Sequence, residues 1–488
     1  MTSRAARIGR LQLDLTTPTG FAPFPGGTGL AQGRDVVRLA NVWDALRGSF
    51  WFLPALLTVL AAGLALGLVA LDRHGGDPEP GPSLWLYAGG AEGARSLLSA
   101  VAGSIITVVG LAFSITIVSL QLASAQLGPR LLRNFVRDRG NQVVLGTFVA
   151  TFVYCLLVLR TVRGQDGVAG GAFVPHGAIT GAVVLAVVSV GLLIYFIHHA
   201  SMSIQADHVI AAVARDLDAA IEHVFPERLG QEEGDGGAPA PPTEDASEGA
   251  AVRARADGYV VAVDGEALLQ AARDADVVVR LTRRPGEFVI GGEPLARVMP
   301  AGRLDAELEE AVARTSVLGA ERTLIQDTLF GVEQLVEIAV RALSSGHVDP
   351  TTALRCIDRL GAVVARVSER RLPSPYRRDA DGVVRVVAPP LTLEDVVTAA
   401  FTSIRLHGEG SHAVVVRLLE TFERLAALRE RRELHAALLA EAVKIGRAAA
   451  RAFHDPADRE AVYAALERFL RAVRPDVRRN YDVQAPAA

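Results

Sequence analysis

The chain has 488 residues, of which 50% are hydrophobic, and its formal net charge is -4. This length is greater than a single compact domain usually has, and the weak charge lacks the basic excess of nucleic-acid binders. Two cysteines, Cys155 and Cys356, are too few for a disulfide framework. The composition therefore favours a protein of several parts and excludes a small disulfide-stapled domain. We expect no nucleic acid among its partners.

Four segments in the first two hundred residues are apolar over about 20 residues. An α-helix of that length crosses about 30 Å of hydrocarbon. We predict spans at about 50–71, 99–127, 143–159 and 177–197, within a transmembrane domain of residues 41–200. A buried soluble helix is the alternative for any one segment. Four in succession, separated by charged or glycine-rich joints, favour membrane helices.

The charges between these segments predict their orientation, because cytoplasmic loops carry an excess of arginine and lysine. The joint between the second and third segments has four arginines and one aspartate. The joint between the first and second has two arginines and four acidic residues. We predict a multi-pass protein of the bacterial cytoplasmic (inner) membrane, with the lipid bilayer as a partner. Both termini lie in the cytoplasm, including an N-terminal arm over residues 1–40.

The second segment has no charge over 99–127 but carries small and polar residues along one helical face. Steps of three, four or seven residues connect Gly103, Thr107, Gly110, Ser114, Gln121 and Ser124. Such a face suits a neighbouring helix or water better than lipid. Two interpretations stay open: the face lines a path in a homo-oligomer, or it only packs helix against helix.

A basic stretch follows Gly128-Pro129, a pair that should end the second helix. Apolar residues alternate there with Arg130, Arg133, Arg137 and Arg139. This pattern is typical of a short amphipathic helix on the inner leaflet. One interpretation is a gate or a lipid-contacting collar, and the other is an ordinary interfacial connector.

The region after the fourth segment is predicted to be a cytoplasmic helix over 201–229, with the membrane helix continuing to about Val224. His199 and His208 are nine residues apart, about half a turn out of phase, so we predict no metal site there. Residues 230–250 are acidic, rich in glycine and proline and poor in large apolar side chains. They are predicted to form a flexible linker.

Residues 251–300 switch to short, valine-rich strand signals separated by glycine and proline turns. The stretches GYVVAVD and PGEFVIGGEPLARV resemble half of a biotinyl or lipoyl carrier barrel. Such carriers need a modified lysine, and this region contains none. We therefore predict a small β-barrel-like module that is structural and holds no covalent cofactor.

Residues 301–475 are predicted to form a helical domain, followed by a disordered tail over 476–488. Asp349-Pro350 and Asp455-Pro456 are typical helix starts, and Asp381-Gly382 predicts a hairpin turn. An apolar stripe from Ile325 to Ala339 predicts one helix, with Gln326 and Asp327 elsewhere around it. The predicted fold class is four transmembrane helices plus a cytoplasmic α+β region.

Long stretches of the chain resemble a bacterial family known only as a predicted membrane protein with a domain of unknown function. The resemblance is carried by SITIVSLQLASAQLGPRLLRNFVRDRGNQVVLGTFVATFVYCLLVLRTVR, by IHHASMSIQADHVI and by RTLIQDTLFGVEQLVEIAVRALSSGHVDPTTALRCIDRL. It covers most of residues 41–475. It implies an integral membrane protein and no functional residues.

The sequence contains no nucleophile elbow, no phosphate loop and no cluster of metal-ligating residues, so we predict no enzyme and no cofactor. His347 and Asp349 resemble a catalytic pair, but a helix cap explains Asp349 without chemistry. The leading hypothesis is a homo-oligomeric channel or permeation-like protein with the second span lining the path. The alternative is a membrane-anchored sensor or scaffold whose cytoplasmic region binds a partner or small ligand.

Overall fold

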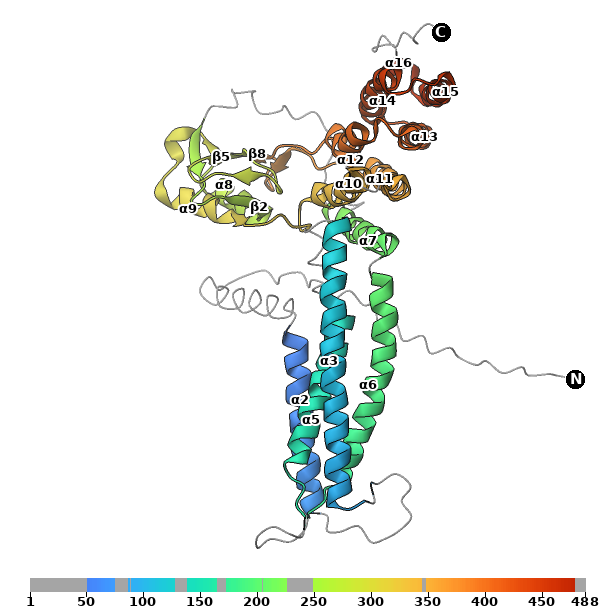
Figure 1. Cartoon of the computed structure of the whole chain (residues 1–488). Helices are drawn as coiled ribbons and strands as arrows, with labels where there is room; N and C mark the ends of the chain where they lie inside the picture. Colours follow the sequence, from blue (N-terminus) through green and yellow to red (C-terminus); the bar gives the residue numbers. More distant parts are fainter. Residues whose placement is uncertain are drawn as a thin grey trace, which may run out of the picture.

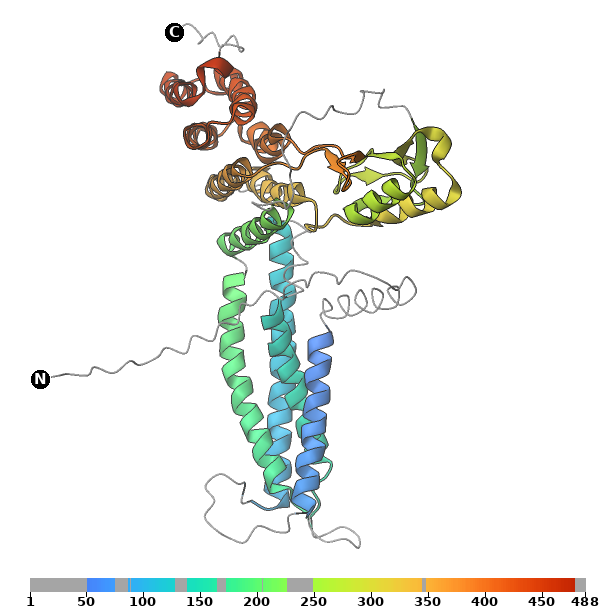
Figure 2. The same cartoon turned by 180° about the vertical axis from the view of Figure 1, so that it is seen from behind.

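The computed structural model describes residues 51–74, 87, 89–127, 138–164, 173–203, 205–225, 249–344 and 348–478. A shaft of long helices carries a head made of two lobes, one containing sheets and one purely helical (Figure 1). The reverse view shows the same division, with the sheets and the last helices on opposite sides of the shaft axis (Figure 2). The predicted arm, most of the linker and most of the tail lie outside the described residues.

The shaft confirms the prediction of four apolar helices. They are α2 (Phe52–His74), α3 (Ala91–Leu127), α5 (Arg139–Leu159) and α6 (His176–Ser203). Each is long and apolar enough to cross a membrane, over Phe52–His74, Ala91–Leu122, Arg139–Leu159 and His176–Ala200. Helix α3 begins at Ala91, eight residues before the predicted span, and its first turn contains Glu92.

Helix α5 is the centre of the shaft. Within its apolar window 56% of the residues are buried, against 17% to 22% in the other three helices. Gly146 lets α5 approach α2 so closely that a Cβ there would lie 2.8 Å from the Cα of Pro54. On the other side, the Tyr154 hydroxyl donates to the carbonyl of Ala178 in α6 at 2.8 Å. The bundle is therefore packed around α5.

The fourth membrane helix does not continue to Val224, so that prediction was wrong. Helix α6 ends at Ser203, and α7 (Ala206–Val224) begins after Gln205, whose ψ of 126° is extended. The break lets α7 lie across the top of the shaft against α10 and α11 (Figure 1). Its buried residues recur at helical spacing, at Val209, Ile210, Val213, Leu217 and Ile221.

The sheet lobe contains eight described strands in two sheets: β1 (Ala250–Arg253), β2 (Gly258–Val263), β3 (Val278–Leu281), β4 (Phe288–Val289), β5 (Pro294–Met299), β6 (Ser316–Gly319), β7 (Tyr376–Arg378) and β8 (Val384–Val387). The order is β1-β5-β3-β8-β7 in one sheet and β4-β2-β6 in the other. Strands were thus predicted at the right places in 251–300, and the sheets that contain them also take in strands from beyond residue 300.

The lobe draws strands from outside the predicted module. β8 pairs parallel with β3, and β6 pairs antiparallel with β2. The β7–β8 hairpin was predicted from Asp381-Gly382, and Gly382 has the positive φ of 77° that this turn requires. Two helices, α8 (Gly265–Asp274) and α9 (Ala306–Thr315), and a 3-10 turn (Ala301–Arg303) complete the lobe. The sequence prediction missed β6 and α8.

The helical lobe comprises α10 (Thr328–Ser344), α11 (Pro350–Glu369), α12 (Leu393–Gly408), α13 (His412–Leu428), α14 (Arg432–Ala452), α15 (Pro456–Ala472) and α16 (Pro475–Arg478). Alternate helices touch: α10 packs on α12 and α12 on α14, while α11 packs on α13 and α13 on α15. The lobe is therefore a two-row stack of helical hairpins around one apolar core. Asp349 and Asp455 cap α11 and α15, as predicted.

Candidate functional site

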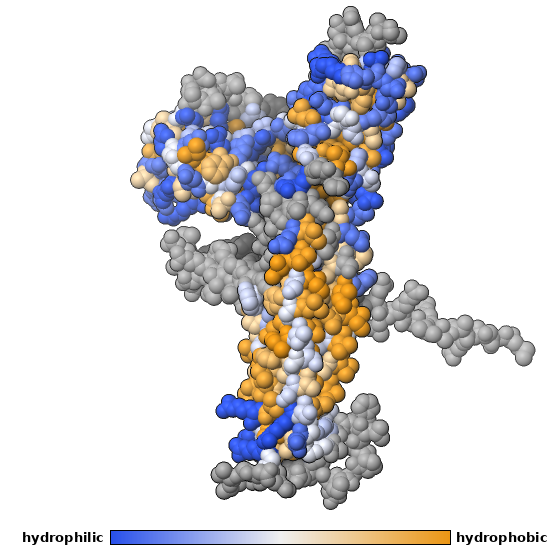
Figure 3. Space-filling view, in the orientation of Figure 1, coloured by the Kyte–Doolittle hydropathy of each residue, from blue (hydrophilic) through white to orange (hydrophobic). Residues whose placement is uncertain are grey.

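The predicted polar face of α3 points away from the other three helices. Gly103, Thr107, Gly110, Ser114 and Gln121 are all exposed. The opposite side of α3 is buried against α5 and α6 through Ala102, Ile105, Val109 and Ala112. Figure 3 shows the result as a pale stripe along α3 between strongly hydrophobic surfaces. Ser124 belongs to α3, but its side chain lies outside the described residues.

The hydroxyls on this face satisfy their donors within the helix. Thr107 Oγ1 donates to the Gly103 carbonyl at 2.9 Å, and Ser114 Oγ donates to the Gly110 carbonyl at 3.0 Å. Each hydroxyl oxygen keeps acceptor capacity toward the outside. A Cβ added at Gly103 or Gly110 would meet nothing within 4 Å. The face is therefore a weakly polar surface that no other described part of the chain covers.

Gln121 lies six residues before the end of α3. Helix α3 continues past the ends of α2 and α5 to contact α10 (Figures 1 and 2). With 37 residues, α3 is about 55 Å long at 1.5 Å per residue. Gly103, Thr107, Gly110 and Ser114 therefore lie along the part of α3 that packs on α5 and α6, and Gln121 lies nearest the end that contacts α10.

Of the four arginines predicted to form a basic stretch after the second span, one lies among the described residues. Arg139 is the exposed first residue of α5, whereas Arg130, Arg133 and Arg137 lie outside the described residues. Next to Arg139, Asp138 caps α5 by accepting from the Gly140 amide at 2.8 Å.

The sequence analysis did not single out Asp138, which also meets His199 of α6. The second carboxylate oxygen of Asp138 lies 2.5 Å from His199 Nε2, and Tyr195 stacks on that imidazole. The pair joins the start of α5 to the end of α6. In the part of the chain that the structure describes, no three His, Cys, Asp or Glu side chains gather as for a metal ion.

Asp349 and the two cysteines have structural roles. Asp349 accepts from the Thr352 amide at 3.2 Å and from the Thr352 hydroxyl at 2.6 Å, while His347 lies outside the described residues. Cys356 is buried in the helical lobe, and this burial raises the pKa of its thiol to about 12. A thiol that stays protonated is a poor nucleophile. Cys155 is also buried, at the centre of the shaft.

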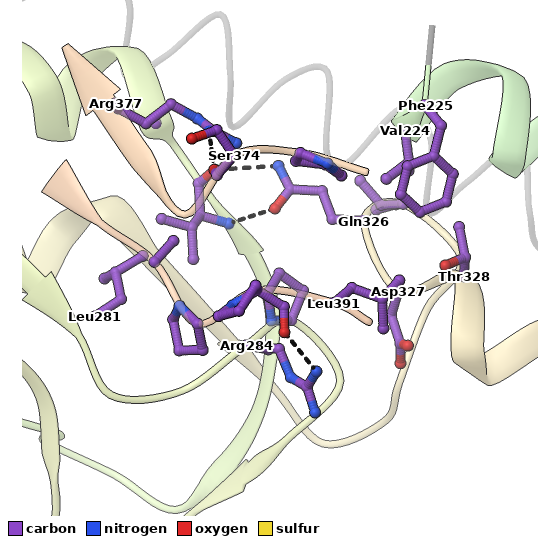
Figure 4. A pocket seen from close by; sticks show the side chains of 18 of the residues that line it. Val224, Phe225, Leu281, Arg284, Gln326, Asp327, Thr328, Ser374, Arg377 and Leu391 are labelled. Carbon is purple, nitrogen blue, oxygen red and sulfur yellow. Dashed lines mark hydrogen bonds between the residues drawn. The ribbon is translucent and has the colours of Figure 1, made fainter. Parts of the chain in front are cut away.

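A cavity of about 430 Å³ opens between the two lobes, and the sequence analysis did not predict it. Five segments far apart in sequence form its walls: the end of α7, the start of α8, the β3–β4 loop, the turn before α10 and residues 373–391. Figure 4 shows Val224 and Phe225 on one side, Leu281 on the other and Gln326 between them. The sequence signal that could have indicated it is the proline density around the β7–β8 hairpin, at Pro373, Pro375, Pro389 and Pro390.

Most polar groups in the cavity wall are paired. Arg284 donates to Asp395 at 2.8 Å and to the Pro390 carbonyl at 3.1 Å. Burial by itself would lower the pKa of Arg284, but the ion pairs with Asp395 and Glu287 raise it above its usual value. Asp327, which the sequence placed on a helix surface, is instead buried at the start of α10 and paired with Arg322 at 2.7 Å.

Four apolar helices followed by a lobe with sheets and a lobe of stacked helices define a membrane protein with four candidate spans and a large extramembrane region. The chain belongs to the family described as "Predicted membrane protein (DUF2254)", whose model matches residues 47–424. The resemblance noted in the sequence is thereby confirmed.

The chain is also similar to uncharacterised proteins of Mycobacterium bovis and Mycobacterium tuberculosis. Each is 31% identical over 486 residues, which cover 97% of this chain and 91% of the relative. No solved structure matches the chain. The names of these relatives state no activity.

Proposed function

We propose that the protein is a homo-oligomer of the bacterial cytoplasmic membrane in which α3 of each copy lines a permeation path. The observation that carries this proposal is the outward direction of the Gly103, Thr107 and Ser114 face. The inside of one bundle is filled by side chains such as Leu98, Phe148 and Tyr154. A path must therefore form around a symmetry axis between copies.

The chemistry of the face favours passage of an ion or small polar solute without proton coupling. Hydroxyl oxygens can accept from or coordinate a solute, and the glycines leave room beside them. The middle of α3 contains no acidic or basic residue, whereas proton-coupled transporters usually carry a titratable group in the membrane. In this proposal the protein is not an enzyme, and both termini and the extramembrane lobes face the cytoplasm.

The experiment uses single cysteines in a Cys155→Ser, Cys356→Ser background, in the membrane. Thr107→Cys and Ser114→Cys test the face, and Val187→Cys on α6 is the control because its side chain is 68% exposed on the apolar surface. We expect both test positions to react with a water-soluble thiol reagent and to cross-link between copies, with the control protected. Reconstituted protein should conduct, and Gly110→Leu should reduce the flux while the oligomer persists.

Two other outcomes of the cysteine experiment would contradict a permeation path along α3. Cross-linking without labelling means that the face packs copies together in a dry interface. Quenching of labels at Thr107 and Ser114 by lipid-phase probes, to the same degree as at Val187, means that the face meets lipid.

A second candidate is a membrane-anchored sensor or scaffold. The observation that favours it is the direct contact of α3 with α10, together with the position of α7 between α6 and the helical stack. Changes in the lobes would reach the membrane helices through these contacts. An assembled protein that passes no ions or solutes in liposomes would favour this candidate over the first.

A further inference from the structure

The cavity between the lobes has apolar walls that remain sheltered from solvent. Phe225 at the end of α7 is 1% exposed, and Leu281 of β3 is 9% exposed. Leu391, ahead of α12, adds to the same surface. A volume of about 430 Å³ falls within the range of about 300–1,000 Å³ typical of small-molecule pockets.

The polar groups in the wall hold the lobes together and leave little for a ligand. Gln326 accepts from the Val263 amide at 2.9 Å and donates to the Val263 carbonyl at 3.1 Å, so it binds the last residue of β2. Arg284 is paired with Asp395, and Asp327 with Arg322. Within each of these two ion pairs, the positive and the negative charge neutralise each other.

Arg377 of β7 is a cation in the wall that, within the described chain, lacks such a pair. It lines the cavity and donates to the Ser374 carbonyl, and among the described residues it has no acidic partner. The neighbouring Arg378 donates to the Gly382 carbonyl at 2.9 Å and does not line the cavity. Successive side chains of a strand point to opposite faces, which explains why only one of the two arginines reaches the pocket.

We propose that this cavity binds a small amphipathic anion, with its apolar body against Phe225, Leu281 and Leu391 and its anionic group on Arg377. A guanidinium without a carboxylate partner at the edge of an apolar pocket is complementary to a carboxylate or a phosphate. The cation and the apolar wall together select against neutral and against fully polar molecules.

The inference rests on the second proposed function, a membrane-anchored sensor or scaffold, and names the class of ligand that it binds. It does not depend on a permeation path along α3. Two of its wall residues, Val224 and Phe225, terminate α7, and α7 follows α6 after two residues. An occupant therefore contacts the sheet lobe, the start of the helical stack and the helix attached to the fourth membrane span. Binding at this place links the state of the lobes to the membrane helices.

The test is equilibrium dialysis of octanoate and naphthalene-2-carboxylate against the full chain in lipid nanodiscs. The corresponding neutral carboxamides are the ligand controls, and empty nanodiscs give the lipid background. Arg377→Met removes the charge, and Arg378→Met is the matched control on the same strand. Ala388→Phe fills the cavity from the wall without changing any charge.

We expect saturable binding of at least one carboxylate and about tenfold weaker binding of its carboxamide. Arg377→Met should weaken the carboxylate about tenfold, as loss of one charged hydrogen bond does, and Arg378→Met should leave it unchanged. Ala388→Phe should remove binding of both forms. Because Arg377 is exposed, its substitution is not expected to unfold the protein, and the thermal transition of each variant checks this.

The proposal is overturned if neither carboxylate binds above empty nanodiscs. It is also overturned if Arg377→Met and Arg378→Met bind alike. Flux through α3 is not part of the measurement, so failure of this site and failure of the permeation path are distinguished.

Discussion

Helices α3 and α5 lie side by side in the same bundle, and both carry polar side chains along membrane-length segments. In α5 these groups are turned inward: Thr151 is fully buried and its hydroxyl lies 3.1 Å from that of Ser189 on α6. In α3 the comparable groups, Thr107 and Ser114, are turned outward and bond only to their own helix. Polarity in α5 is used to assemble one chain. In the described part of the chain, these polar groups of α3 make no hydrogen bond with the other three helices, and in the proposed function they face the other copies of the chain.

The largest expected difference between the two helices is at their glycines. A Cβ at Gly146 would lie 2.8 Å from a backbone atom of Pro54, whereas one at Gly103 would meet nothing within 4 Å. Gly146→Ala should therefore destabilise the bundle by about 1–3 kcal/mol, the usual cost of overpacking. Gly103→Ala should leave its stability unchanged.

Thermal unfolding of the two variants in one detergent measures the difference. Equal destabilisation by both substitutions would mean that α3 is also enclosed within a single chain, and the comparison would fail.

A second substitution tests whether the lobes unfold independently of the bundle. Asp349→Ala removes the cap of α11, which should cost about 0.5–2 kcal/mol in the helical lobe. The Thr352 hydroxyl bond, aided by backbone N–H bonds, lowers the pKa of Asp349 below its usual value. A depressed pKa contributes stability that is present above the carboxyl's ordinary pKa of about 3.9 and is lost as pH falls through the lower folded-state pKa.

Denaturant unfolding at pH 6 and pH 3 should therefore show a smaller loss on acidification for Asp349→Asn than for the unchanged chain. If Asp349→Ala shifts the melting of α5 as much as that of the lobe, the two regions unfold as one unit. The stability changes of variants in the membrane helices would then have to be measured with a probe located in those helices.

The smallest expected effect compares two threonines. Thr151→Val removes the buried hydroxyl facing Ser189 and should cost about 0.6 kcal/mol, an average value for hydrogen bonds between membrane helices. Thr107→Val keeps the shape but removes an outward hydroxyl, so it should leave the stability of one chain unchanged and lower flux through the assembly. A stability loss at Thr107 as large as that at Thr151 would argue that both hydroxyls serve packing.

The sequence correctly predicted those elements that are determined by residues close together in the chain. The four spans follow from apolar runs of membrane length, the caps at Asp349 and Asp455 from an acceptor before a proline, and the β7–β8 hairpin from Asp381-Gly382. The end of α6 was missed because the helix breaks at Gln205 without glycine or proline. Beyond the break, α7 packs on α10 and α11, a contact between segments far apart in the sequence.

The candidate sites also divide into features that the local sequence determines and features that only the tertiary structure determines. Periodicity placed Gly103, Thr107, Gly110 and Ser114 on one face of α3, because a helix sets that relation by itself. Whether the face points into the bundle or away from it depends on which side of α3 packs on α5, and the tertiary structure decides this. The cavity could not be predicted, because Leu281, Arg377 and Leu391 meet through the parallel pairing of β8 with β3, and Phe225 joins them through the packing of α7 on α10 and α11. Such pairing joins residues about a hundred positions apart, over which local sequence patterns carry no information.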